Sequence, residues 1–110
     1  MLSDTIKAAR GIVEKGWCKG RYADGKGNFC VYGATMQAEG TGWQQITWGD
    51  WSTAQPVEYS PAAAKASRFL DEIARQMGYR DSAKFNDDLH TTHQDVLNFF
   101  DKALAELGAM

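Results

Sequence analysis

The fold depends most on the segment Gly16-Trp17-Cys18-Lys19-Gly20-Arg21-Tyr22-Ala23-Asp24-Gly25-Lys26-Gly27-Asn28-Phe29-Cys30-Val31-Tyr32-Gly33-Ala34. These nineteen residues hold five glycines, one Trp and both cysteines of the chain. Between Trp17 and Phe29 the helical period disappears, and Asp24-Gly25 and Lys26-Gly27 are turn sequences because Gly accepts positive φ without penalty. We expect an irregular Gly-rich hairpin or Ω-like loop over residues 17–29, with the later helices packed around it.

Helical periodicity flanks this loop on both sides. Apolar residues recur at helical spacing through residues 4–15, which predicts a first helix that ends at Gly16. After the loop, Asn28 is a good N-cap for a short second helix that continues to Glu39. Within that helix, Gly33 would let a neighbouring backbone approach closely.

A tryptophan-rich segment follows, from Trp43 to Tyr59. It has no helical period, although residues 45–48 alternate weakly like a strand. We therefore expect a long ordered loop, or one short hairpin, over residues 43–59. The segment contains three tryptophans and two charged residues: Trp43, Trp48, Trp51, Asp50 and Glu58.

Two further helices complete the predicted fold. Ser60-Pro61 begins a third helix, because a hydroxyl N-cap followed by Pro suits the first helical position, and Gly78 ends it. Residues 79–90 form a connection in this prediction, anchored by the buried side chains of Phe85 and Leu89.

The last helix begins with Thr91, which forms a capping box with Gln94, and it ends at Gly108. The predicted fold class is mainly α. We expect a compact four-helix domain that carries the Gly-rich loop (17–29) and the Trp-rich segment (43–59).

Length, charge and cysteine content limit the classes of function. The 110 residues fit one domain, residues 1–110, and the net charge of −2 gives no general attraction to nucleic acid or acidic membranes. No apolar run reaches the ~20 residues needed to cross a bilayer, and the N-terminus lacks the order of a signal peptide. Two cysteines are too few for a secreted disulfide framework. We therefore expect a cytoplasmic protein, monomeric or homodimeric, that binds no double-stranded nucleic acid, no membrane and no cofactor.

Cys30 is the first candidate for chemistry. If Asn28 caps the second helix, Cys30 lies in its first turn, where the helix dipole favours the thiolate. With His90 or His93 as base, and Asn86 or Asp87 as the orienting group, such a thiol would form a Cys-His arrangement for nucleophilic catalysis. The alternative is a buried cysteine that packs as a small hydrophobe beside its apolar neighbours, which is the commoner role when no diagnostic sequence surrounds the thiol.

A metal site is the second candidate. Cys18, Cys30, His90 and His93 supply four possible zinc ligands, but eleven residues separate the cysteines and two separate the histidines. Zinc sites pair cysteines at tight spacing and histidines at wider spacing, so we expect no metal. A Cys18–Cys30 disulfide across the loop is geometrically conceivable, but reducing cytosol would leave it transient or absent.

The tryptophans form the third candidate. Trp43, Trp48 and Trp51, together with Asp50, could form an aromatic surface that binds a protein partner or a planar ligand. No Lys or Arg occurs from Gly27 through Ala64, so the basic groove needed by a single-stranded nucleic-acid site is missing. The alternative is that these rings cover the second and third helices and complete the core.

The order of short motifs resembles a known family. Gly16-Trp17-Cys18-Lys19-Gly20, Ala23-Asp24-Gly25, Cys30-Val31-Tyr32-Gly33-Ala34 and Phe85-Asn86-Asp87 follow one another ahead of a Thr-initiated last helix. This order is similar to that of a small domain family of unknown function in actinobacteria and their phages, with Phe85 in place of its Trp and no counterpart for residues 43–59. The resemblance implies a shared scaffold but no activity. The shared positions in this chain are Trp17, Gly20, Cys30, Gly33, Asn86 and Asp87.

Our leading hypothesis is therefore a phage-encoded accessory protein that binds a protein partner through the Trp43–Trp51 segment, in the cytoplasm of a bacterial host. A hydrolase or transferase that depends on the Cys30 thiol is the first alternative. A second alternative is binding of a small ligand or nucleotide by the Asn86–Asp87 region and the loop around residues 20–27, although no phosphate-loop motif supports it.

Overall fold

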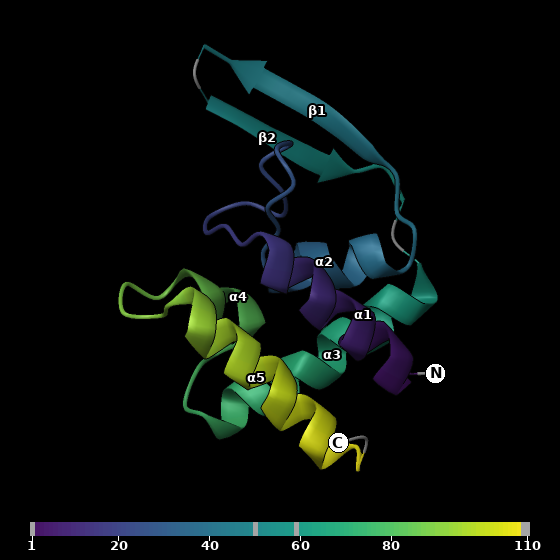
Figure 1. Cartoon of the computed structure of the whole chain (residues 1–110), viewed down its shortest axis with the longest axis vertical. Coiled ribbons are helices and arrows are strands. Elements are labelled where there is room, and N and C mark those ends of the chain that lie inside the picture. Colours follow the sequence, from purple (N-terminus) through teal and green to yellow (C-terminus); the bar gives the residue numbers. More distant parts are fainter. Residues whose placement is uncertain (1, 50, 59, 109–110) are drawn as a thin grey trace.

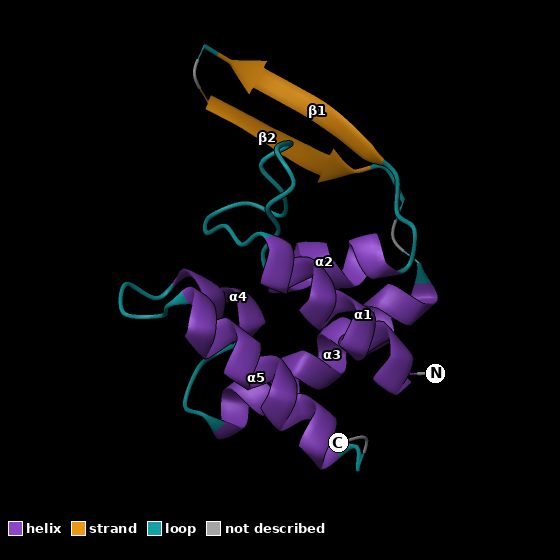
Figure 2. Cartoon of the chain, viewed as in Figure 1, coloured by secondary structure: helices purple, strands orange, loops and turns teal. Residues whose placement is uncertain are grey.

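The computed structural model describes residues 2–49, 51–58 and 60–108. Over these residues it contains five helices and one antiparallel hairpin. The expected mainly α fold class is therefore confirmed, whereas the expected number of four helices was too low by one. Figures 1 and 2 show the helices gathered into one body, with the hairpin standing apart from them and the Gly-rich loop between the two. The elements are α1 (Leu2–Lys15), α2 (Val31–Ala38), β1 (Trp43–Trp48), β2 (Trp51–Pro56), α3 (Pro61–Gln76), α4 (Ser82–Asp87) and α5 (His93–Glu106).

The additional helix, α4, lies inside the predicted connection. It spans six residues and is capped by Asp81, whose Oδ1 accepts from the Lys84 amide at 2.9 Å. Fewer than two turns give too few residues for a helical period, which explains why the sequence did not reveal it. Phe85 is buried in α4 as expected, but Leu89 is 85% exposed, so its assignment as a buried anchor was wrong.

Two helix caps differ from the predicted ones. Cys30, not Asn28, is the N-cap of α2, because the Asn28 side chain donates to Asp24 Oδ2 at 2.6 Å inside the loop. The capping box of α5 joins Thr92 and Asp95, one residue beyond the predicted Thr91 and Gln94. Thr91 is itself buried, and its amide donates to the Asp88 carbonyl at 3.1 Å.

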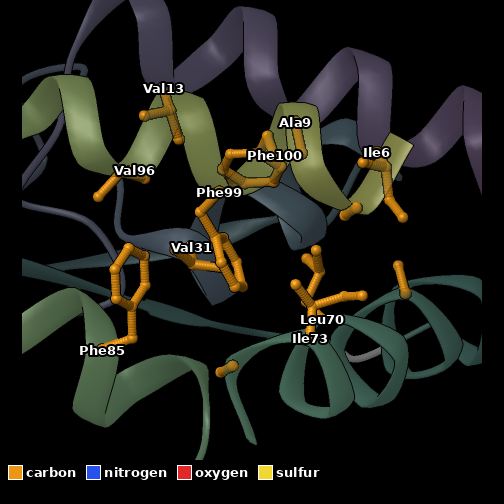
Figure 3. Packing of buried hydrophobic residues seen from close by; sticks show 14 of the residues in the cluster. Ile6, Ala9, Val13, Val31, Leu70, Ile73, Phe85, Val96, Phe99 and Phe100 are labelled. Atoms are coloured by element: carbon orange, nitrogen blue, oxygen red, sulfur yellow. The ribbon is translucent and has the colours of Figure 1, made fainter. Parts of the chain in front are cut away.

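The core lies among the five helices, and Figure 3 shows how its side chains interdigitate. Phe99 of α5 is at its centre, 4.7 Å from the Phe85 ring and 5.9 Å from Phe100 between centroids. Each fully buried side chain of this size contributes about 1.5–3 kcal/mol, so the helical body carries most of the hydrophobic stabilisation. The fully buried larger apolar residues are Ile6, Val13, Val31, Leu70, Ile73, Val96, Phe99 and Phe100.

The Gly-rich loop folds back on itself around Phe29. The Phe29 amide donates to the Gly16 carbonyl at 3.2 Å, and its carbonyl accepts from the Cys18 amide at 3.2 Å. Phe29 thus forms a parallel bridge with Trp17 and an antiparallel bridge with Ala23. The turn of this irregular loop lies between Asp24 and Asn28 and brings Phe29 opposite Ala23, and both cysteines are free thiols.

The Trp-rich segment forms a hairpin, which is one of the two forms predicted for it. β1 and β2 pair antiparallel from Trp43↔Pro56 to Trp48↔Trp51. The Gly-rich loop covers the outer edge of β2: the Ala54 amide donates to the Ala23 carbonyl at 2.8 Å, and Ser52 Oγ donates to the Asp24 carbonyl at 2.8 Å. Within the part of the chain that the structure describes, β1 has β2 as its one sheet neighbour.

Candidate functional site

Asn86 joins three parts of the chain that are far apart in sequence. Its Oδ1 accepts from Trp17 Nε1 at 2.8 Å and from the Val31 amide at 3.2 Å. Its Nδ2 donates to the Cys18 carbonyl at 3.1 Å and to Asp87 Oδ1 at 2.8 Å. The side chain is 1% exposed, and these four bonds use its whole hydrogen-bonding capacity. Asn86 therefore fixes the loop, the start of α2 and the end of α4 relative to one another.

Trp17 packs against the start of α5 through His93. The two rings stack with their centroids 5.8 Å apart and an interplanar angle of 20°. Lys19 Nζ also lies over the Trp17 ring, 5.4 Å from its centroid. His93 Nε2 donates to the Val13 carbonyl at 2.6 Å. His90 is exposed in the middle of the connection between α4 and α5. The contacts of His93 are thus with α1 and Trp17, which gives it a packing role.

Cys30 combines a helix N-terminus with burial. Its Sγ accepts from the Gly33 amide at 3.3 Å, and its side chain is 8% exposed. Burial raises the pKa of the Cys30 thiol to about 11, against the lowering effect of the Gly33 and Tyr32 amides. Burial first, and then the charge of the neighbouring Cys30 thiolate, likewise raise the pKa of Cys18 to about 12. Both thiols are therefore protonated at neutral pH.

A cavity of about 310 Å³ opens beside Cys30 where the loop, α2, α4 and β2 meet. Four of the motif residues that the sequence singled out, Gly20, Cys30, Asn86 and Asp87, line it together. Its described lining includes neither His90 nor His93, so the structure does not assemble the Cys-His arrangement considered from the sequence. Within the described residues, no group of three or more His, Cys, Asp or Glu side chains is placed to hold a metal ion.

The sequence indicated several of the other lining residues only through their segments, the loop around residues 20–27 and the motif that begins at Cys30. Arg21 and Tyr22 lie between two of the quoted motifs, so their position in the loop was the signal that could have identified them. Tyr32 follows Cys30 at the start of α2. Thr53 reaches the cavity because its strand is bound to the loop, and no sequence pattern predicts that pairing.

The predicted partner-binding residues lie in different environments. Trp43 is half-buried, tilts against Phe29 at 5.8 Å and donates from Nε1 to Gln37 Oε1 at 2.7 Å, so it anchors the hairpin to the body. Trp48 is 70% exposed at the far end of β1. Asp50 lies outside the described residues, and for Trp51 the structure describes the backbone, which pairs with Trp48, but not the side chain.

Comparison with known proteins identifies the scaffold. The model of DUF6197, a family of unknown function, matches residues 2–106. This chain belongs to that family. The expectation of a family of unknown function is thereby confirmed. No curated protein and no solved structure matches this DUF6197 chain. Among the helices described for it, none is long and apolar enough to cross a membrane.

The thiols of this DUF6197 protein give a direct test of the enzyme alternative. At pH 8 we expect iodoacetamide to modify Cys30 about 100-fold more slowly in the folded than in the unfolded chain, because a pKa of about 11 against an ordinary 9.0 leaves little thiolate. The rate should rise as the pH approaches 11. Peptide mass spectrometry after timed alkylation measures it, with Cys18 followed in the same samples.

The same raised pKa affects stability. The buried neutral thiol favours the folded state fully below pH 9, and this contribution is lost as the pH rises towards 11, because only the unfolded chain readily releases the proton in that window.

A Cys30 that alkylates at pH 7 as fast in the folded protein as in urea would contradict the alkylation prediction and would instead support a reactive nucleophile.

Proposed function

We propose that this protein is an accessory protein that binds an extended segment of a protein partner, which adds as a new strand to the open edge of β1. The exposed ring of Trp48 adds contact area beside that strand. The observation that carries the proposal is the contrast between the two outer edges of the hairpin, because the Gly-rich loop covers that of β2, while that of β1 has no strand beside it in the described structure.

The direction of the β1 backbone groups follows from the loop contact. The Ala54 amide donates to Ala23, away from β1, and Ala54 pairs with Gln45. Ala54 and Gln45 therefore form a non-hydrogen-bonded pair, in which the backbone N–H and C=O of both residues point away from the partner strand. The N–H and C=O of Gln45 thus face the open edge of β1. The same alternation applies to Trp43 and Thr47. β1 therefore presents a regular row of donors and acceptors over its full length.

The sequence of β1, Trp43-Gln44-Gln45-Ile46-Thr47-Trp48, has none of the features that protect exposed edges. Edge strands in proteins are commonly blocked by charged side chains, by Pro or by a bulge, and β1 contains no charge and no Pro. An incoming strand would meet no side chain that repels it. Recognition through main-chain hydrogen bonds, with side chains supplying specificity, is the established mode of strand addition.

The chemistry of the partner segment follows from the same residues. No Lys or Arg occurs between Gly27 and Ala64, so the hairpin offers no positive charge to acidic partners. A segment with β-branched or aromatic residues would pair with β1 and pack beside Trp48. The proposal also takes the protein to be phage-encoded and to act in the cytoplasm of a bacterial host, as its resemblance to actinobacterial and phage proteins implies.

The test replaces Thr47 by Pro. This change removes one outward N–H without removing a bond to β2, so the hairpin should persist while strand addition is blocked. Thr47→Val is the matched control, because it keeps the N–H and the β-branched shape. We expect the wild type and Thr47→Val to capture the same host proteins in a pull-down, and Thr47→Pro and Trp48→Ala to lose them.

Binding must then be measured with purified components. Isothermal titration of each captured protein should show at least a tenfold weaker affinity for Thr47→Pro than for Thr47→Val, at unchanged melting temperature. Sedimentation of the protein alone shows whether a second copy occupies the edge, in which case a dimer would be lost in Thr47→Pro. Equal capture and equal affinity in both variants would refute strand addition.

A further inference from the structure

The cavity beside Cys30 has a rigid, saturated floor. Val31 is fully buried, and every donor and acceptor of the Asn86 side chain is already hydrogen-bonded to protein atoms. The Tyr22 carbonyl, which accepts from the Cys30 amide at 3.1 Å, lies against Gly33 and holds the loop over α2. The floor is therefore preformed, and it offers a ligand mainly apolar contact.

Two tyrosines form one wall of this cavity and separate it from a second one. Tyr22 and Tyr32 line both the cavity beside Cys30 and a neighbouring cavity next to α3. The Tyr32 hydroxyl donates to Asp71 Oδ1 at 2.6 Å, and Asp71 also accepts from the Ser82 amide at 2.9 Å. The position of the Tyr32 ring is thus fixed. A flat or branched apolar group could pack against it without reorganising the wall.

The rim carries one charge of each sign. Asp87 is exposed, and its Oδ1 is oriented by the Gly20 amide at 2.9 Å and by Asn86 Nδ2 at 2.8 Å. Arg21 lines the same cavity, and its guanidinium donates to the Ser52 carbonyl on β2. Both side chains are positioned by hydrogen bonds to the scaffold, so a ligand does not have to order them.

The start of α2 is not available to a phosphate. The Val31 amide donates to Asn86, and the Gly33 amide donates to Cys30 Sγ. Anion sites at helix N-termini depend on free amides, and two of them are already used here. The Asp87 carboxylate would also repel a purely anionic ligand. These contacts argue against the nucleotide considered from the sequence.

We propose that this cavity binds a free α-amino acid with an aromatic or branched aliphatic side chain. The ligand ammonium group pairs with Asp87 and its carboxylate with Arg21, while the side chain packs on Cys30 and Ala83 beside the tyrosines. A volume of about 310 Å³ is at the small end of ligand sites, which span roughly 300–1,000 Å³, and suits a ligand of this size. This site is separate from the β1 edge and independent of its function.

The test titrates the full-length protein with L-phenylalanine and L-leucine, followed by amide chemical shifts in NMR spectra. Phenylacetate, which lacks the ammonium group, and phenethylamine, which lacks the carboxylate, should bind at least about tenfold more weakly, since each loses one charged hydrogen-bonded contact. Shifts should be concentrated at Gly20, Val31 and Asp87. Adenosine monophosphate serves as the nucleotide probe.

Two variants localise the site. Asp87→Asn removes the charge and should weaken L-phenylalanine binding at least about tenfold, while the neighbouring Asp88→Asn, which lies outside the lining, should leave it unchanged. Ala83→Leu fills the cavity from α4 and should abolish binding at unchanged melting temperature. Thr47→Pro should bind amino acids normally, which separates this proposal from strand addition. The proposal fails if neither amino acid binds at millimolar concentration, if Asp88→Asn weakens binding as much as Asp87→Asn, or if the nucleotide binds more tightly.

Discussion

Replacing Gly33 by Ala is expected to lower the free energy of unfolding by about 3 kcal/mol, one of the two largest effects that the structure predicts for a single substitution. A Cβ at this position would lie 1.9 Å from the Tyr22 carbonyl oxygen and 2.7 Å from its carbonyl carbon. Both atoms belong to the backbone, so no side-chain rotation can relieve the overlap. The loop and α2 must separate, and the bond from the Cys30 amide to Tyr22 is strained with them. Urea unfolding followed by circular dichroism measures the loss.

Gly11 provides a matched control on another helix. An added Cβ there meets nothing within 4 Å, and Ala is a better helix former than Gly. Gly11→Ala should therefore raise the free energy of unfolding by roughly 0.5–1 kcal/mol. If the two substitutions changed stability in the same direction and by similar amounts, the close approach of Tyr22 to α2 would be wrong.

Replacing Asn86 by Ala should cost about 4 kcal/mol of unfolding free energy, because it leaves several buried groups without a partner. The Trp17 indole N–H, the Val31 amide and the Cys18 carbonyl would each lose a hydrogen bond that protein atoms now supply. Thermal and urea unfolding give the size of the loss. Quenching of Trp17 fluorescence by acrylamide should increase as well, because its ring is no longer tied to α4.

Asn98 on α5 is the control for Asn86. Its Oδ1 accepts from Gln94 Nε2 at 3.0 Å on an exposed helix face, so Asn98→Ala should change stability by no more than about 0.5 kcal/mol. A loss below about 1 kcal/mol for Asn86→Ala would show that water replaces the missing contacts. In that case the loop and α4 would not depend on this residue for their relative position.

The helices that were predicted well are those long enough to show a period. α1, α3 and α5 each cover fourteen or more residues, and their apolar stripes identify both the element and the buried face. α4 covers six residues, so it was missed. The caps were misplaced by local competition: Asn28 has a better partner in Asp24, and two adjacent threonines offer equivalent starts to α5.

The candidate site shows a different limit. Glycines, cysteines and the Asn86-Asp87 pair indicated which residues matter to the scaffold, and the close approach at Gly33 was predicted from its place in the helix and is confirmed. A small-ligand site that joins the Asn86–Asp87 region to the loop around residues 20–27 was considered from the sequence, but the hydrogen bond of Asn86 to Trp17 was not predictable, because it spans 69 positions of sequence. The covered edge of β2 depends on a bridge between Ala23 and Ala54, for which no pattern in either segment gives a signal.

The long-range contacts of α1 have a consequence for biosynthesis. Arg10 binds Asp101 across 91 positions, and His93 binds the Val13 carbonyl across 80. The apolar stripe of α1 is therefore without its α5 cover until the residues of α5 have themselves left the ribosome. During that interval a chaperone that shields nascent chains would bind the apolar face of α1, and the arrival of α5 closes this part of the core.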